Sequence, residues 1–499
     1  MAMVQTLGRV RARKRTEILR LSDLTGGEAS IFPVLAMNPK YSMRMQNCQI
    51  SERGTIAKIP GYVKVNTTSC GVTLKKGFEF KKTDGTTVIL SAGDGKIFSG
   101  TGESLTEVHT DLDGSAKVRF AAMNSQCIAC NGVDAPLIST DGTTWTALGG
   151  SPPATAFKPH VHKGRVWMLE RTNKMLATHS SLNNPAEYTG GTSGYIDFKF
   201  VLKTGDELLD IFTFVDLLVF MFRNHIAIYS GVTPSGVDSD FAILQLIAGA
   251  GVVGTDTIQE LGTDCAFLYD SGIKSFKQVV STGNLNLDDI STNISPTIRA
   301  LISDATDFDS AHYPRYGWYI IKIGTSIFIY DYIHKSWGRI VGSDIQGMFT
   351  KTDGTLFLCG TNFLYQYDSG FDFAGVLPTM RWDSAYLPLS KHGEKAYPKM
   401  AEIVFYPHEP ATVSMYYSYD VQGFNTTYYQ SLATQPTDFY YIDDVTNWDA
   451  IDPFDSIAYD PLKIMLRGGG RTMQLRMENT SNKLIEITDI AILYTRGGF

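Results

Sequence analysis

Runs of apolar residues recur along the chain in pairs that are joined by short polar turns. The clearest pair lies at residues 318–331, where WYIIKI and IFIYD flank a Gly-Thr-Ser turn. Branched and aromatic residues on both sides of a glycine turn predict an antiparallel hairpin. Both arms are almost wholly apolar, whereas a hairpin with one exposed face would alternate apolar and polar residues. We therefore expect other sheets to cover both faces of this hairpin.

The same arm-turn-arm pattern occurs seven times, with turns 36 to 52 residues apart. The turns lie near Asp94, Gly132, Asn173, Asn224, Gly272, Gly324 and Gly360. A repeat of this length, in which no unit can bury its own faces, is typical of a β-propeller. We predict an all-β protein with six or seven radially arranged blades; a set of unrelated hairpins in a large sandwich is the alternative.

The pattern divides the chain into three parts. The repeat occupies residues 65–376, and we assign this part to the propeller. After it come strand-like runs at 401–406, 412–419, 463–467, 472–477 and 483–495, which predict a sandwich-like platform domain at 377–499. Residues 1–64 form an N-terminal arm and lead-in strands, which we expect to pack with the platform.

Composition and charge narrow the functional classes. The formal net charge is -7 and the pI about 5.8, so bulk electrostatics do not favour polyanion binding. Six cysteines in 499 residues are sparse, as in a chain that folds in a reducing cytoplasm and uses cysteine in its core. We expect no secretory signal, because no apolar core follows the basic residues near the N-terminus. That basic arm is either a solvated tail or an arm that docks on a neighbouring subunit or touches nucleic acid.

Few residues suggest chemistry. Cys127 and Cys130 have zinc-like spacing but belong to one predicted strand, where they face opposite sides. His160 and His162 share a strand face, yet no third metal ligand is identifiable, so we expect two partly exposed histidines. No nucleophile elbow or catalytic triad is recognisable. We predict a protein that is not an enzyme and that has no cofactor and no metal site.

Two stretches carry a family resemblance. Residues 41–62 include YSMRMQNC and RGTIAKIPGY, with Ile59 where the family has a basic residue before the proline. Residues 249–341 contain GAGVVG, LYDSGIKSF and YDYIHKSW in that order. The first stretch resembles the lead-in segment, and the second the late blades, of short-tailed phage tail nozzle proteins, also described as packaged-DNA stabilisation proteins. The resemblance covers roughly residues 30–499.

The resemblance implies a structural virion protein of the phage tail, assembled in the host cytoplasm. It would form a ring, commonly a homo-hexamer, below the head-tail adaptor protein, and carry tail fibres or spikes that contact the host surface. Double-stranded DNA would pass during ejection without specific binding. We expect an acidic channel wall and place it at Asp443, Asp444, Asp449, Asp452 and Asp455; an ordinary solvated loop is the alternative for this stretch. We expect subunit interfaces at Arg9, Arg11, Arg13, Lys14, Arg15, Tyr416, Tyr417, Tyr440 and Tyr441. The rival class is a propeller that hydrolyses glycans or binds a carbohydrate or receptor.

Overall fold

The computed structural model describes residues 16–202, 205–236, 239–278, 285–391, 394–406, 410–424, 429–434 and 461–497. Its contacts divide the chain into two compact units. One unit, here called the propeller, is residues 60–378, and the other, the platform, combines residues 1–59 with 379–499. Almost all regular structure is strand. None of the helices in the described part of the chain has the length and hydropathy to cross a membrane.

The propeller consists of seven antiparallel blades of four strands each. Blades one to three are β6–β9 (Lys76–Lys81, Thr87–Gly93, Lys96–Gly100, Thr106–His109), β10–β13 (Arg119–Met123, Gln126–Cys130, Leu137–Ser139, Thr146–Ala147) and β14–β17 (Ala156–His162, Arg165–Glu170, Leu176–His179, Gly194–Asp197). Blades four to six are β18–β21 (Leu208–Phe214, Leu217–Phe222, His225–Ser230, Ala242–Ala248), β22–β25 (Gln259–Glu260, Cys265–Tyr269, Gly272–Gln278, Leu285–Asp289) and β26–β29 (Phe308–Tyr313, Trp318–Ile323, Ser326–Asp331, Ser336–Ile340). Blade seven combines β30–β32 (Gly347–Thr350, Leu356–Cys359, Leu364–Tyr367) with β5 (Tyr62–Lys64). The short helices are η1 (Phe198–Phe200), η2 (Thr292–Ile294) and α1 (Ser295–Ile302).

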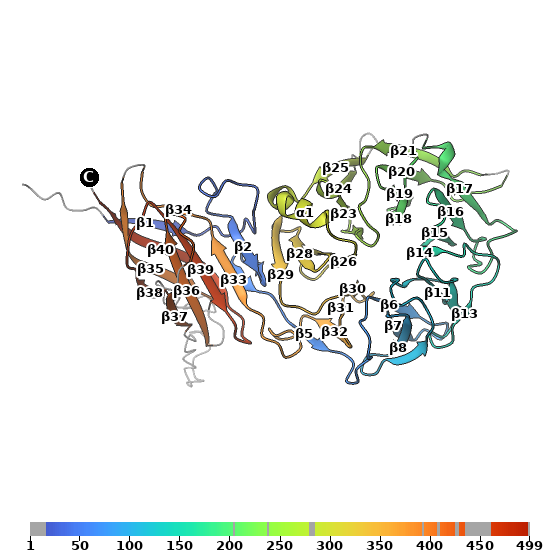
Figure 1. Ribbon diagram of the computed structural model, residues 1–499, viewed down its shortest axis with the longest axis horizontal. Coiled ribbons are helices and arrows are strands. Elements are labelled where there is room, and N and C mark those ends of the chain that lie inside the picture. The colour runs from blue at the N-terminus through green and yellow to red at the C-terminus, as the bar shows by residue number, and fades with distance from the viewer. Residues whose placement is uncertain are drawn as a thin grey trace, which may run out of the picture. The chain divides into compact units, whose positions relative to one another are not determined.

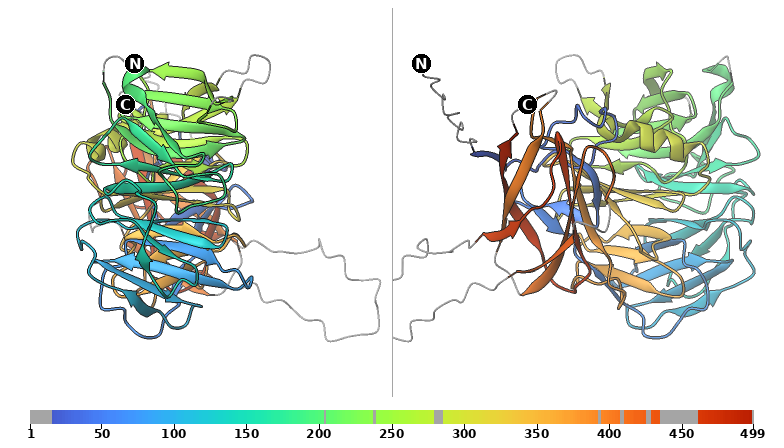
Figure 2. Two further views of the ribbon diagram at one scale, coloured as in Figure 1. Left: turned by 90° about the vertical axis from the view of Figure 1, so that its right-hand side faces the viewer. Right: turned by 60° about the vertical axis from the view of Figure 1, so that its left-hand side comes forward.

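The first strand of each blade lies nearest the propeller axis. Figure 1 looks along this axis and shows β18, β14, β6 and β30 around the centre, with β21, β17 and β13 at the rim. Neighbouring blades accordingly contact one another through their first strands, for example β10 with β14 and β26 with β30. Figure 2 shows the blades from the side.

The seven predicted turns all fall between the second and third strands of successive blades, which confirms the repeat. The predicted start of the propeller at residue 65 is wrong by one strand. β5 pairs with β32, with Tyr62 opposite Tyr367, and supplies the fourth strand of the last blade. No local pattern reveals this pairing, because the partner strand lies about 300 residues further along the chain.

The hairpin at residues 318–331 is the best-buried part of the sixth blade. Every residue of β27 is buried, and in β28 only Ser326 is partly exposed. Trp337 of β29 is 1% exposed, packs on Tyr330 and donates its indole N–H to the Ile290 carbonyl at 2.9 Å. The Asp331 carboxylate accepts hydrogen bonds from the backbone of the turn that follows it. The expectation that both hairpin faces are covered is confirmed.

The end of the lead-in segment closes the last blade. Gly61 donates its N–H to the Gly370 carbonyl, and a Cβ atom at this glycine would lie 1.9 Å from the Asp372 carbonyl oxygen. Tyr62 stacks on Phe373, with ring centroids 4.8 Å apart. No side chain fits at residue 61, so glycine is required for the chain to pass this point.

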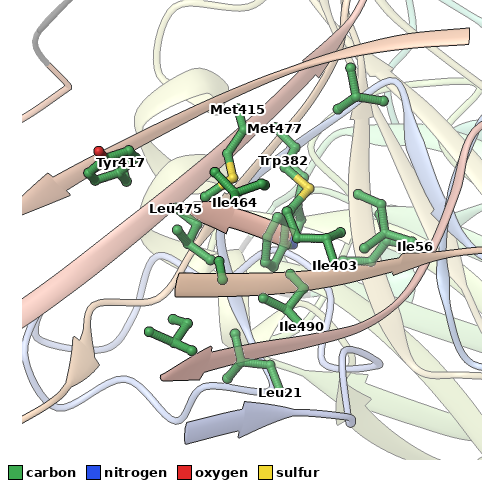
Figure 3. Packing of buried hydrophobic residues seen from close by; sticks show 14 of the residues in the cluster. Leu21, Ile56, Trp382, Ile403, Met415, Tyr417, Ile464, Leu475, Met477 and Ile490 are labelled. Carbon is green, nitrogen blue, oxygen red and sulfur yellow. The ribbon is translucent and has the colours of Figure 1, made fainter. Parts of the chain in front are cut away.

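The platform is a sandwich of two sheets built from both ends of the chain. One sheet has the order β3-β4-β40-β35-β38, with β1 beside β40, and the other β2-β33-β39-β36-β37, with β34 beside β39. Their bounds are β1 Thr16–Leu21, β2 Ser42–Gln46, β3 Cys48–Ile50, β4 Ile56–Lys58, β33 Met380–Ser384, β34 Leu387–Pro388, β35 Ala396–Phe405, β36 Ala411–Tyr419, β37 Tyr429–Thr434, β38 Leu462–Met465, β39 Thr472–Asn479 and β40 Glu486–Arg496. Figure 3 shows the shared core, in which Trp382, Met415 and Met477 of one sheet meet Ile403 and Ile490 of the other.

Candidate functional site

The propeller axis holds the main concentration of buried charge in the described part of this unit. Lys76, Arg119 and Lys158 come from the first strands of blades one to three, while Asp210 and Asp309 come from those of blades four and six. Asp256 lies just before the first strand of blade five. The three carboxylates are almost completely buried, with side-chain exposures of 1%, 0% and 4% for Asp210, Asp309 and Asp256.

These charges pair with one another across blades. Lys158 Nζ lies 3.0 Å from both Asp210 Oδ1 and Asp256 Oδ1, and Arg119 Nε lies 2.7 Å from Asp256 Oδ2. Lys76 Nζ is 2.6 Å from Asp309 Oδ1. In addition, the backbone N–H of Asp256 donates a hydrogen bond to the Asp210 carboxylate. Three cations and three carboxylates thus cancel, and we call them the axial ion network.

The axial ion network is stable only as a set. Burial alone would raise the pKa of Asp256, but the charges of Arg119 and Lys158 hold that pKa well below its usual range. Burial alone would lower the pKa of Lys158, yet Asp210 and Asp256 raise it above the ordinary value. Asp256 and Lys158 therefore stay ionised at neutral pH. Carboxylates committed to cations in this way do not form the free acid and base pair that glycoside hydrolysis needs.

A hollow of about 460 Å³ opens where the first strands of blades three, four and five end. It is lined by His160, Val161, His162, Lys163, Phe212, Thr213, Asp216, Ile258 and Glu260. The Thr213 hydroxyl lies 2.9 Å from His160 Nε2 and 3.0 Å from His162 Nδ1. A hydroxyl has one proton and two lone pairs, so at most one imidazole accepts a hydrogen bond from Thr213 and at least one donates to it.

Both imidazoles are neutral at pH 7. Burial lowers the pKa of His160 to about 3 and that of His162 to about 4. The expectation of two partly exposed histidines is wrong for His162, which is 5% exposed, because Thr213 of the next blade covers it. At the rim Lys163 Nζ pairs with Asp216 at 3.0 Å, and Glu260 is exposed. The hollow can accept a small polar ligand by hydrogen bonding.

The residues that the sequence predicts to line a DNA channel or a subunit interface belong neither to the axial ion network nor to the hollow. Asp443, Asp444, Asp449, Asp452, Asp455, Arg9, Arg11, Arg13, Lys14, Arg15, Tyr440 and Tyr441 lie outside the described residues. Tyr416 is half-buried on β36. Tyr417 is 3% exposed and belongs to the platform core, so its prediction as an interface residue is wrong. Alternation along β36 turns Tyr417 inward, where its hydroxyl accepts the Arg467 N–H.

Sequence reasoning missed the axial ion network. A signal was present, since Asp210 interrupts a mainly apolar run between Leu208 and Phe222, which Asp216 also breaks. A charge in the middle of a buried strand requires a partner, but pattern alone cannot name one on another blade. The histidines, in contrast, were recognised as sharing a face, and they do meet through Thr213.

Comparisons with known proteins return structural neighbours of low sequence identity and low TM-score. No protein-family model and no curated protein matches the chain. Among solved structures, the extracellular domain of BT4673 from B. thetaiotaomicron is 10% identical with a TM-score of 0.44; it aligns with 68% of this chain, which spans 43% of that one. Streptogramin B lyase is 13% identical with a TM-score of 0.41, and the alignment covers 61% of this chain and 96% of that one. The Pan2 WD40 domain of Neurospora crassa is 8% identical with a TM-score of 0.39, and the alignment covers 62% of this chain and 96% of that one. The chain is an all-β protein, and its larger unit is a β-propeller.

Proposed function

We propose that this chain is a structural virion protein, the nozzle subunit of a short-tailed phage tail. The observation that carries the proposal is the position of the lead-in motif. The motif resembles that of nozzle proteins, and its Gly61 and Tyr62 seat the strand that closes the propeller ring. The order of parts is therefore the one that the resemblance implies: lead-in strands, propeller and platform.

The axial ion network supports a scaffold role. Its buried ion pairs join residues of different blades and so link these blades to one another. In this proposal DNA passes through the lumen of a ring of protomers, not through the axis of one propeller. The ring is a homo-hexamer that binds the head-tail adaptor on one side and tail fibres or spikes on the outside.

Native mass spectrometry and electron microscopy of the purified protein test the proposal. The expected result is a closed ring with a central channel wide enough for duplex DNA. A protein that stays monomeric, alone and with its adaptor, contradicts it.

The acidic stretch provides a second test of the proposal. A channel that conducts DNA must avoid many phosphate contacts, because each neutralised phosphate tightens binding. Reversal of Asp443, Asp444, Asp449 and Asp452 to Lys should slow or block DNA delivery while particles still assemble. Replacement of the same residues by Asn is the matched control, and it should have the smaller effect. Delivery at the wild-type rate by the Lys variant shows that this stretch does not line the path.

The hollow beside His160 and His162 favours a second candidate, a propeller that binds or hydrolyses glycans. Its rim carries two carboxylates, Asp216 and Glu260, and its floor offers neutral hydrogen-bonding groups. Titration with soluble oligosaccharides, followed by calorimetry and by release of reducing ends, tests this candidate. Saturable binding that Thr213→Val abolishes supports it, and the absence of both binding and turnover contradicts it.

A further inference from the structure

The outer strand of the fourth blade, β21, differs from its counterparts in the other blades. It spans seven residues, Ala242–Ala248, and none of them is charged. Every other fourth strand of three or more residues contains at least one charged side chain. These residues are Glu107 in β9, Asp197 in β17, Asp288 and Asp289 in β25, Arg339 in β29 and Lys64 in β5.

β21 is also exposed. Ile243, Leu244 and Leu246 keep 41%, 53% and 42% of their surface, and β20 is the strand that pairs with β21 in the described sheet. The outer edge of such a strand presents backbone N–H and C=O groups that template pairing with another chain. Native proteins usually protect long edges with charge, and this edge has none.

The sequence of β21 is a palindrome, Ala-Ile-Leu-Gln-Leu-Ile-Ala, centred on Gln245. We propose that β21 is a docking edge for a second copy of this chain, paired antiparallel about a two-fold axis at Gln245. This arrangement places Ala242 opposite Ala248, Ile243 opposite Ile247 and Leu244 opposite Leu246. Each cross-strand pair matches in size, and branched aliphatic pairs stabilise an antiparallel ladder.

The lack of charge is what lets this strand face its own copy. In a two-fold pairing the central residue meets itself, and a charge there would oppose a like charge, which destabilises a ladder. The uncharged Gln245 avoids that repulsion. Leu244 is the extra residue of a bulge against β20, at the register shift between Ile228 and Tyr229. The two-fold axis sets this bulged half of each copy against the regular half of the other, so the two bulges do not meet.

The inference goes beyond the proposed function and does not rest on it. A two-fold contact is isologous and is complete after two copies, whereas a ring requires head-to-tail contacts that close by rotation. The two kinds of assembly differ in stoichiometry, so each can be present or absent independently of the other.

Sedimentation velocity over about a hundredfold range of protein concentration tests the dimer. The wild-type chain should show a concentration-dependent dimer, and Leu244→Lys with Leu246→Lys should raise its dissociation constant at least tenfold. Thr106→Lys with Thr146→Lys adds the same charge at exposed positions on the outer strands of blades one and two. This matched control should dimerise as the wild type does, and circular dichroism should show that all three proteins are folded.

Disulfide formation tests the register. Opposed residues in an antiparallel pair have Cα atoms about 4.5–5.5 Å apart, within the range that a disulfide spans. Gln245→Cys should therefore cross-link to its own copy under mild oxidation, whereas Ile243→Cys alone should not. A mixture of Ile243→Cys and Ile247→Cys should give the mixed cross-link. The six native cysteines are buried or half-buried, and peptide mapping separates any contribution from them.

Three results would overturn the inference. The first is a wild type that stays monomeric over the whole concentration range, and the second is a Leu244→Lys and Leu246→Lys variant that dimerises as well as the control. The third is a cross-link that maps to another pair of residues. If the lysine substitutions abolish the two-fold dimer but a six-fold ring still forms, the proposed function is unaffected. The loss of the dimer then still supports β21 as the docking edge.

Discussion

At the scale of single residues, His160 and His162 in the hollow show how burial lowers the pKa of an imidazole. Burial disfavours the charged imidazole, so His160 and His162 remain neutral until the pH falls to about 3–4. In the unfolded chain a histidine binds its proton near pH 6.5. Between these limits the unfolded state binds more protons than the folded state, and stability must fall as the pH falls.

This difference predicts an acid-sensitive propeller. Each of the two histidines should cost about 1–2 kcal/mol of unfolding free energy between pH 7 and pH 5. Urea denaturation at the two pH values measures the loss. His160→Gln with His162→Asn preserves the hydrogen-bonding nitrogen positions without titrating, and this variant should show a flatter pH dependence. An equally steep dependence in the variant would assign the acid sensitivity to other groups.

Trp337 is the second residue with a direct energetic consequence. Its indole is fully buried between sheets and hydrogen-bonded to Ile290, so Trp337→Ala creates a large cavity. We expect a loss of about 3–5 kcal/mol in unfolding free energy. Phe200→Ala removes another aromatic ring at a site that is 87% exposed, and it should change stability by less than about 0.5 kcal/mol. Equal melting temperatures for the two variants would contradict the burial of Trp337.

At the scale of strands and turns, the sequence was most informative where hydrophobic patterning is local. The second and third strands of each blade form hairpins a few residues apart in sequence, and their apolar arms identified all seven. The fourth strands were harder, because strands such as Thr106–His109 and Thr146–Ala147 lie at the rim and are short and polar. The pairing of β5 with β32 and the ion pairs between blades depend on contacts distant in sequence, which periodicity does not encode.

Gly61 is the most restrictive point in the closing strand. A Cβ atom there would overlap the Asp372 carbonyl, so Gly61→Ala must displace either the strand or the loop. We expect about 1–3 kcal/mol of destabilisation, with increased amide hydrogen exchange concentrated in β5 and β32. Gly149→Ala, at a glycine with nothing within 4 Å of the added carbon, should leave exchange unchanged. Unchanged exchange in both variants would show that the closing strand does not depend on Gly61.

The axial ion network links strands of different blades, and Asp256 is its centre. Asp256→Asn leaves Arg119 and Lys158 without the carboxylate that both contact, which should cost about 3–5 kcal/mol. The ion pairs of Asp256 also determine how stability depends on pH. Because the pKa of Asp256 is lowered in the folded state, its contribution to stability is lost only as the pH falls below about 3.9. Urea unfolding at neutral pH checks the substitution, with Asp216→Asn, at an 81% exposed ion pair, as the control. Similar small losses in both would show that the network is dispensable.

At the scale of the whole molecule, the two units should lose structure independently. Ile490 lies on β40, the strand that pairs with β1, β4 and β35, and it is completely buried. Ile490→Asp introduces an unpaired buried charge into the platform. We expect amide protection to fall across the described strands of both platform sheets while the propeller blades keep theirs. Ile18→Asp, at a 64% exposed position of the same sheet, is the control, and loss of protection in the blades would show that the units unfold together.

The closure of the last blade by β5 has a consequence for synthesis of the chain. Asn66, just after β5, accepts a hydrogen bond from Leu364, 298 residues later. At 5–20 residues per second a ribosome needs about 15–60 s to cover that distance. During this interval the nascent ring is open, and the apolar faces of its first and latest blades lack their final neighbours. The platform is completed later still, since β40 follows every propeller strand along the chain. Chain direction alone therefore sets the order in which the two units are completed, propeller first, and makes the open ring the form that most needs protection from aggregation.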